Sequence, residues 1–502
     1  MTLVALVLLS ALLRTGPPGG DDAFAGSWMT TFGPLELDGK GKALSGPYGW
    51  GKESKLEGKR AGDKLEFEWS GPNGRGTGWF ELWKDGRTFV GESAFGQGQK
   101  EFWGGYRIEP ARAEPRPGEI SDGQTELHLN YHLRVPFDYD AKKHYTALAL
   151  FHGSNTNSRD YVEGFPHNWP QLAERFILVG FDGEHLSAAS RDGVRAFNAS
   201  YVEFSGDKVG EPWRYMETPA LVAGALKELS GTLPIERWFV GGHSQGAYLT
   251  YAVAMYYPEL VGGAFPVSGA LLVQCVPDQF QDEKTCAAQR RVPFAIVHGE
   301  KDAVVEFASS LTARGSFEDG AFPMLRLFSD PKAGHPWAFL PVDDALAWLA
   351  DMTSPDPAAL LAFAKKSVAE QQYRDATGAL ERLRALDPAR AKSDEAAEVY
   401  AAIDAAAAPE LARLAPAISA NKDGAWVDAF WDFRARFGLA PSASDLMKSY
   451  AKLRAKHEKP AANFFWKARS EEDPKKRREL SREIVERYYA SSFYPIVKQW
   501  AD

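Results

Sequence analysis

The 502-residue chain has only two cysteines, Cys275 and Cys286. Two thiols cannot form a disulfide-dense scaffold or a four-thiolate metal site, so both of these classes are excluded. An excess of positive charge is also lacking, because 58 Lys and Arg residues are outweighed by 67 Asp and Glu residues and the formal net charge is −9. Neither nucleic acid nor an anionic membrane is therefore an expected partner.

The amino-terminal apolar run, residues 3–13, is too short to span a membrane as a helix. It is followed by Ala23-Phe24-Ala25, which resembles the A-x-A sequence that precedes a signal-peptide cleavage site. We therefore expect residues 1–25 to be a signal peptide. The mature chain should then be exported to the periplasm or the extracellular space, without a membrane span. The alternative is a disordered start with a chance apolar run.

The chain is longer than one hydrophobic core usually organises, so several domains are expected. Residues 26–107 contain 19 of the 46 glycines and 6 of the 15 tryptophans. Short alternating runs such as 64–69 are separated by turn sequences such as 71–74, which predicts an all-β meander closed as a barrel or sandwich. The tryptophans either line a ligand cleft or, as is more usual in a small β domain, fill its core.

A proline-rich linker is expected at residues 108–122. From 123 to 352, continuous apolar runs such as 147–151 alternate with helical stretches such as 247–257, which predicts an α/β domain with a mostly parallel sheet. Residues 353–502 are rich in Ala, Glu, Lys and Arg with helical periodicity, so we expect an all-α domain of six to eight helices. The predicted fold is therefore multidomain.

The α/β block carries a G-x-S-x-G sequence at residues 242–246. An apolar strand at 238–240 leads into it, and the helical stretch at 247–257 follows it. Glycines on both sides of the serine permit a sharp strand-to-helix turn that lifts the hydroxyl clear of the sheet. This context predicts that Ser244 is a nucleophile.

A serine nucleophile needs a base and an acid that orients the base. Asp302 follows the apolar strand at 294–297, and His335 follows a strand at 324–328. The order Ser, Asp, His, with each residue after a different strand, is the α/β-hydrolase order. We therefore expect Ser244, Asp302 and His335 to converge at one edge of the sheet.

Three other residues compete for these roles. Asp182, after the strand at 176–181, is an alternative acid, and His298 is an alternative base. Packing beneath its loop is the simpler role for His298. His152 is a third candidate, but a histidine at this position more commonly braces its loop by a hydrogen bond.

A tetrahedral intermediate needs backbone N–H donors directed at its oxyanion. We expect one donor from Gln245, directly after the nucleophile. The second should come from Ser154, in the turn after the strand at 147–151. Together these two residues form the predicted oxyanion hole.

Two segments, 185–217 and 272–292, are expected to form a cap over the catalytic edge. Trp213 in the first segment and Trp337 beside His335 are candidate substrate contacts. The two cysteines lie in the second segment, which is polar. Because an exported chain meets an oxidising compartment, we expect them to form a disulfide, and two buried free thiols are the alternative.

Residues 127–349 resemble an α/β-hydrolase of the carboxylesterase kind. They are similar to the phospholipase/carboxylesterase and dienelactone-hydrolase groups and to polyhydroxybutyrate-depolymerase-like esterases. The segments that carry the resemblance are 135–140, 151–153, 242–246, 298–302 and 334–335. The resemblance implies a serine hydrolase on an α/β-hydrolase fold.

The leading hypothesis is a serine esterase that cleaves a small-molecule or polymer-linked carboxylic ester through an acyl-enzyme. No cofactor is expected, and the histidines lack metal-ligand spacing, so no catalytic metal is expected either. A serine peptidase on the same fold and a catalytically inactive binding protein are the alternatives. The β and helical blocks either bind a polymer or a partner, or, for the helical block, simply pack against the hydrolase.

Overall fold

The structure is a computed structural model that describes residues 23–501 apart from several internal segments. The segments outside the description are 50–51, 73, 83–85, 87, 96–97, 109–111, 128, 155, 184, 187–194, 197–216, 273–274, 278–285 and 422–423. Most of the expected signal peptide, and the candidate substrate contact Trp213, therefore lie outside the described residues. The described chain forms two compact units, one mainly of residues up to Glu109 and one from Pro110 onward.

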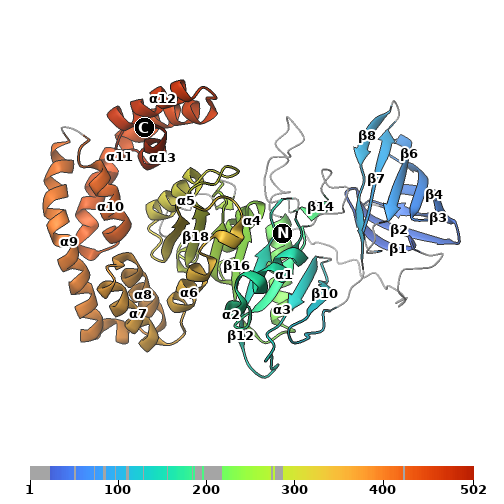
Figure 1. Ribbon diagram of the computed structural model, residues 1–502, viewed down its shortest axis with the longest axis horizontal. Coiled ribbons are helices and arrows are strands. Elements are labelled where there is room, and N and C mark those ends of the chain that lie inside the picture. Colours follow the sequence, from blue (N-terminus) through green and yellow to red (C-terminus); the bar gives the residue numbers. More distant parts are fainter. Residues whose placement is uncertain are drawn as a thin grey trace. The chain divides into compact units, whose positions relative to one another are not determined.

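The first unit is an antiparallel β-barrel (Figure 1). Its strands are β1 (Gly26–Thr30), β2 (Gly33–Lys40), β3 (Ala43–Tyr48), β4 (Ser54–Ala61), β5 (Lys64–Gly71), β6 (Gly74–Leu82), β7 (Thr88–Phe95), β8 (Gln99–Phe102) and β9 (Gly105–Arg107). They pair in the order β6-β5-β4-β3-β2-β1-β9-β7-β8, and an additional pairing of β6 with β7 closes the ring. Of the two all-β forms expected, the barrel is the one observed.

The barrel core follows from the alternation of its strands. In β5, Leu65, Phe67 and Trp69 are buried while the charged residues between them are exposed. Because successive side chains of a strand point to opposite faces, one face of β5 lines the core. Trp28 and Trp103 are buried in the same core as Trp69. For these three tryptophans, the interpretation as core residues is correct.

The second unit contains an eight-stranded sheet in its described part. Its strands are β10 (Ile120–Gln124), β11 (Asn130–Arg134), β12 (Tyr145–Phe151), β13 (Ile177–Phe181), β16 (Ile235–His243), β17 (Val261–Val267), β18 (Phe294–Gly299) and β19 (Leu325–Asp330). The order is β10-β11-β13-β12-β16-β17-β18-β19, and every pairing from β13 to β19 is parallel. β10 and β11 are antiparallel additions at one edge, and β10 begins inside the predicted linker. Two short strands, β14 (His185–Leu186) and β15 (Arg195–Ala196), fall in the first predicted cap segment.

Helices cover both faces of this sheet (Figure 1). They are α1 (Ser158–Asn168), α2 (Pro170–Ala173), α3 (Glu217–Ser230), α4 (Gln245–Tyr256), α5 (Ala308–Asp319) and α6 (Val342–Met352). Leu148 and Leu150 of β12 pack with residues of α1 and α6. Ala147 and Ala149, on the opposite face, pack with residues of α3, α4 and α5. The apolar strand run is buried on both sides, as a parallel sheet requires.

Beyond α6 the chain is helical. The helices are α7 (Pro357–Ala369), α8 (Tyr373–Leu386), α9 (Asp394–Ala420), α10 (Val427–Phe437), α11 (Ser444–Ser470), α12 (Pro474–Arg487) and α13 (Tyr494–Ala501). Asp356 and Asp473 cap α7 and α12 and are each followed by a proline, a frequent helix start. One hydrophobic core runs without interruption from the sheet through α6 to α11. The helical block therefore packs directly against the α/β domain.

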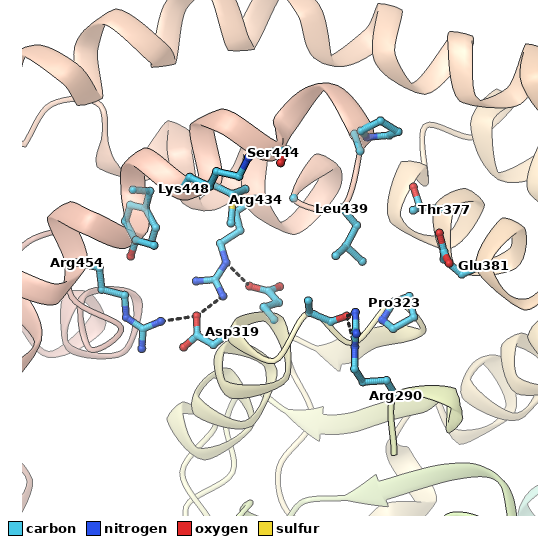
Figure 2. A pocket seen from close by; sticks show the side chains of 18 of the residues that line it. Arg290, Asp319, Pro323, Thr377, Glu381, Arg434, Leu439, Ser444, Lys448 and Arg454 are labelled. Carbon is cyan, nitrogen blue, oxygen red and sulfur yellow. Dashed lines mark hydrogen bonds and ion pairs between the residues drawn. The ribbon is translucent and has the colours of Figure 1, made fainter. Parts of the chain in front are cut away.

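An ionic cluster also joins the helical block to the α/β domain. Helix α5 ends in Glu318 and Asp319. Arg434 of α10 lies 2.5 Å from Asp319 and 3.6 Å from Glu318, and Arg454 of α11 lies 2.6 Å from Asp319. Arg374 of α8 lies 3.8 Å from Glu318. Figure 2 shows Arg434 and Arg454 converging on Asp319 at the edge of a cavity of about 660 Å³.

No disulfide joins Cys275 and Cys286, and both side chains are fully buried. The expected disulfide is therefore wrong. Cys275 packs in the apolar core on the α4 side of the sheet, and its backbone N–H donates to the carbonyl of Leu272. It behaves as a small apolar residue, which needs no covalent partner.

Among the described residues, no helix is both long and apolar enough to cross a membrane.

Candidate active site

Ser244 occupies the sharp turn between β16 and α4. Its φ of 55° and ψ of −116° are rare for a residue with a side chain. A Cβ on Gly242 would lie 2.5 Å from the carbonyl oxygen of Gly246, and a Cβ on Gly246 would lie 2.1 Å from that of Phe151. Both glycines of the motif are therefore required by close backbone approach.

Ala247 stands directly after the motif and is fully buried. Its Cβ points to Gly269, the second residue after β17. A Cβ on Gly269 would come within 2.3 Å of the Ala247 Cβ. The glycine on the neighbouring loop thus makes room for the alanine at the start of α4.

Asp302 and His335 meet at the same edge of the sheet as Ser244. Ser244 follows β16, Asp302 follows β18 and His335 follows β19, and the carboxyl ends of these parallel strands share one edge. The Nδ1 of His335 donates a 2.7 Å hydrogen bond to Oδ2 of Asp302. Oδ1 of Asp302 accepts from the backbone N–H groups of Val304 and Val305 at 2.8 and 2.9 Å. The carboxylate is thereby fixed, and Nε2 of His335 is left as the acceptor.

The charge of Asp302 is stabilised without an arginine or lysine. Burial raises the pKa of its carboxyl. Hydrogen bonds from His298, His335 and the backbone of Val305 and Val304 outweigh burial and hold the pKa of Asp302 well below its usual range. Asp302 is therefore ionised at neutral pH beside the imidazole of His335.

The two competing residues are also held by hydrogen bonds, and Nε2 of His298 lies 3.3 Å from Oδ2 of Asp302 itself. His298 is fully buried, hydrogen-bonds Ser310 at 2.6 Å, and donates to the carbonyl of Val305 at 2.8 Å. It packs beneath the loop that carries Asp302, as expected. Asp182 accepts a 2.6 Å hydrogen bond from the hydroxyl of Ser158 at the start of α1. Of these two acids, Asp302 is the one hydrogen-bonded to His335.

The two residues of the predicted oxyanion hole lie side by side. The hydroxyl of Ser154 donates to Oε1 of Gln245 at 3.5 Å. Gln245 is the first residue of α4, so its backbone N–H lies at the positive end of a helix dipole. His152 is fully buried, bonds the carbonyl of Gly153 at 2.8 Å, and accepts the N–H of Gly183 at 3.0 Å. It braces the turn after β12 that carries Gly153 and the predicted oxyanion donor Ser154, which we call the oxyanion loop.

Trp337, a predicted substrate contact, packs largely against the protein itself. Its ring centroid lies 4.5 Å from that of Tyr161 and 5.2 Å from that of Trp169. The side chain is only partly exposed and adjoins the core on the α1 side. Its visible role is to anchor the loop that follows His335.

Two residues of the site were not assigned roles from sequence. His243 precedes the nucleophile, and its Nε2 lies 2.7 Å from the carbonyl oxygen of His335. Its Nδ1 lies 2.8 Å from the hydroxyl of Tyr161. His243 was visible within the motif, but no local pattern marks Tyr161, which lies 82 residues away.

Among the described residues, no group of three or more His, Cys, Asp or Glu side chains could hold a metal ion.

Comparison with known proteins finds similarity to carboxylesterases. Residues 216–318 match the family model of the phospholipase/carboxylesterases. This part of the chain is therefore similar to the phospholipase/carboxylesterases. Acyl-protein thioesterase 1 of Eremothecium gossypii is 30% identical over 151 residues, which are 29% of this chain and 62% of that protein. The chain thus spans less than two thirds of this curated relative.

Solved structures of esterases also align with the chain. A thermostable esterase aligns with 18% identity and a TM-score of 0.33, over 56% of this chain and 73% of its own. The acetyl xylan esterase from Aspergillus awamori aligns with 15% identity and a TM-score of 0.35, over 46% of this chain and 99% of its own.

Proposed function

We propose that the protein is a serine hydrolase that cleaves a carboxylic ester through an acyl-enzyme. Ser244 is the nucleophile, His335 the general base and Asp302 the residue that orients the base. The observation that carries the proposal is the 2.7 Å hydrogen bond from His335 to Asp302, at the sheet edge where Ser244 occupies its strained turn. A buried carboxylate beside a neutral imidazole is the arrangement that activates a serine hydroxyl.

In the first half of the reaction, the Ser244 oxygen attacks the ester carbonyl while Nε2 of His335 takes its proton. The imidazolium that forms is stabilised by the ionised Asp302. The backbone N–H groups of Gln245 and Ser154 receive the oxyanion. His335 then protonates the departing alcohol, and the acyl group remains on Ser244.

In the second half, His335 takes a proton from a water molecule as its oxygen attacks the acyl carbonyl; the bond from the acyl carbon to the Ser244 oxygen then breaks, and His335 returns the proton to that oxygen as the acid is released. All of these steps use side chains and backbone groups of the chain itself. The relative from E. gossypii is named a thioesterase, so thioesters belong in the substrate panel beside oxygen esters. Export of the mature chain, expected from residues 1–25, remains part of the proposal.

Labelling with a fluorophosphonate and turnover of aryl esters and thioesters of increasing acyl length test this function. Ser244→Ala should lose on the order of 10⁶-fold in turnover and all labelling, because it removes the nucleophile. Ser268→Ala is the matched control, since Ser268 has a positive φ of 50° after the neighbouring strand β17, as Ser244 has a φ of 55° after β16. The control should label normally. Labelling that survives in Ser244→Ala would refute the assignment.

A further inference from the structure

A chain of hydrogen bonds connects three loops of the candidate site. The N–H of Gly153, in the oxyanion loop, lies 3.2 Å from the Tyr161 hydroxyl oxygen. That hydroxyl lies 2.8 Å from Nδ1 of His243, and Nε2 of His243 lies 2.7 Å from the carbonyl oxygen of His335. The chain therefore runs from the oxyanion loop, through the residue before the nucleophile, to the loop of the base.

The direction of each hydrogen bond is fixed by chemistry. A carbonyl oxygen can only accept, so Nε2 of His243 must carry the hydrogen. A neutral imidazole has one N–H, so Nδ1 is an acceptor and receives the hydroxyl hydrogen of Tyr161. The Tyr161 oxygen then accepts the N–H of Gly153. With a neutral His243, every donor and acceptor in this chain is matched in the Nε2–H tautomer.

The surroundings hold this chain in place. His243 is 9% exposed, and burial lowers its pKa to about 4, so it stays neutral near pH 7. A Cβ on Gly153 would lie 3.2 Å from Nδ1 of His243, so the oxyanion loop packs tightly on the imidazole. The Tyr161 ring also packs against Trp337, two residues beyond His335. The loop that carries His335 is thus linked to Tyr161 in two ways. One is the hydrogen-bond chain through His243, and the other is the packing of Trp337 on the Tyr161 ring.

We propose that His243 is a positioning residue that sets the loop of the base against the nucleophile turn and the oxyanion loop. This proposal rests on the proposed function of the same site. His243 does not act as a base itself, because its Nε2–H is committed to the His335 carbonyl and its Nδ1 to Tyr161. Its contribution is to hold His335 where Nε2 can reach Ser244. Misplacement of a catalytic group by about 1 Å can cost on the order of 100-fold in rate.

Three substitutions separate positioning from simple packing. His243→Phe keeps an aromatic ring but loses both hydrogen bonds, and kcat should fall about 10- to 100-fold with KM within about twofold. His243→Gln can still donate to the His335 carbonyl, so it should recover most of kcat. Tyr161→Phe keeps the contact with Trp337 but removes the hydroxyl, and kcat should fall about tenfold.

Wild-type kcat in His243→Phe would overturn the proposal, and so would a Gln variant no better than the Phe variant. If His243→Phe does not fold, the Gln and Tyr161→Phe variants still decide, with thermal unfolding as the control for global damage. A loss confined to KM would also count against positioning.

A measurement that does not depend on activity completes the test. In ¹⁵N-histidine-labelled wild-type protein, NMR should show His243 as the neutral Nε2–H tautomer near pH 7, and Tyr161→Phe should perturb its Nδ1 resonance. The Nδ1–H tautomer, or a cationic ring, would refute the hydrogen-bond chain. A wild-type protein without ester or thioester hydrolysis would instead refute the proposed function, so the two failures are distinguishable.

Discussion

Asp302 and Glu318 are two buried carboxylates of the same domain, and they lie on either side of the start of α5, Asp302 in the loop before the helix and Glu318 in its last turn. In both, burial raises the pKa and the partners lower it to below its ordinary value. The partners differ in kind. Asp302 is held by imidazoles and backbone N–H groups. Glu318 is held by arginine guanidinium groups, first Arg314 and then Arg434 and Arg374.

This difference matters for proton transfer. The partners of Asp302 include groups that can exchange a proton, whereas the partners of Glu318 can only form ion pairs. An imidazole can be neutral or cationic near pH 7, so His335 can gain a proton beside Asp302 and lose it again. A guanidinium stays protonated at any pH that the fold survives. The cluster around Glu318 is therefore a fixed attachment between α5 and the helices α8 and α10.

The largest expected effect is on turnover and concerns Asp302. Asp302→Asn should lower kcat by about 10⁴-fold, because an amide no longer stabilises the imidazolium or selects the productive tautomer of His335. The side-chain oxygen can still accept from Val304 and Val305, so stability should change much less. Steady-state kinetics with an aryl ester and urea unfolding measure the two quantities. If Asp302→Asn instead lost much stability and kept its activity, the proposed difference in role between Asp302 and Glu318 would be wrong.

The second prediction concerns Glu318, for which we expect a loss of stability and little change in turnover. Glu318→Gln should lower the free energy of unfolding by about 3 to 5 kcal/mol, because the buried guanidinium group of Arg374 loses this carboxylate, although Arg434 keeps its ion pair with Asp319. Turnover per folded molecule should remain close to that of the wild type, since Glu318 lies at the far end of α5 from the loop of Asp302. Urea unfolding and active-site titration with a fluorophosphonate provide these values.

The matched control for Glu318 is an exposed ion pair of the helical block. Lys365 pairs with Glu395, and their side chains are 45% and 59% exposed. Lys365→Ala should cost less than about 1 kcal/mol, because an exposed pair is solvated and screened. Equal costs for the two substitutions would show that burial does not set the strength of the arginine cluster.

The third prediction uses pH to separate the two regions. The pKa of His243 is lowered to about 4 by burial, and the groups that face it are His335, Asp302, His298 and Tyr161. Between pH 6.5 and 4 the unfolded chain binds a proton at this histidine that the folded chain does not. The free energy of unfolding should therefore fall as the pH falls, by about 2 to 3 kcal/mol at pH 4.5.

The arginine cluster should add little in this window, because the pKa of Glu318 is lowered from an ordinary value of 4.5. Urea unfolding of the wild type and of His243→Gln at pH 7 and pH 4.5 tests the prediction, since the glutamine cannot titrate. The same pH dependence in both proteins would assign it to other groups.

Much of the central domain could be predicted from sequence because its signals are local. The glycines around Ser244 mark the turn, and the apolar runs mark the strands whose carboxyl ends bring Asp302 and His335 together. The alternation in β5 predicted its buried face equally well. These patterns each depend on residues a few positions apart, where strand and turn geometry is directly encoded.

The remaining features depend on contacts between residues far apart in the chain. Closure of the barrel by the pairing of β6 with β7 is not visible in any one strand, so barrel and sandwich could not be separated. The bond between Tyr161 and His243 spans 82 residues. The expected disulfide was wrong because the polarity around Cys275 was taken to describe the cysteine, whose own side chain is in the core.

The uninterrupted core from the sheet to α11 makes the helical block part of the same folding unit as the α/β domain. Trp348 and Leu349 of α6 belong to the same apolar cluster as Leu360 and Leu380 of the next two helices. A chain shortened after Met352 would expose this surface to water, and large exposed apolar patches lead to aggregation. Loss of activity on removing the helices would then report failed folding rather than a missing binding partner. The roles of the two regions should therefore be tested by point substitutions and not by truncation.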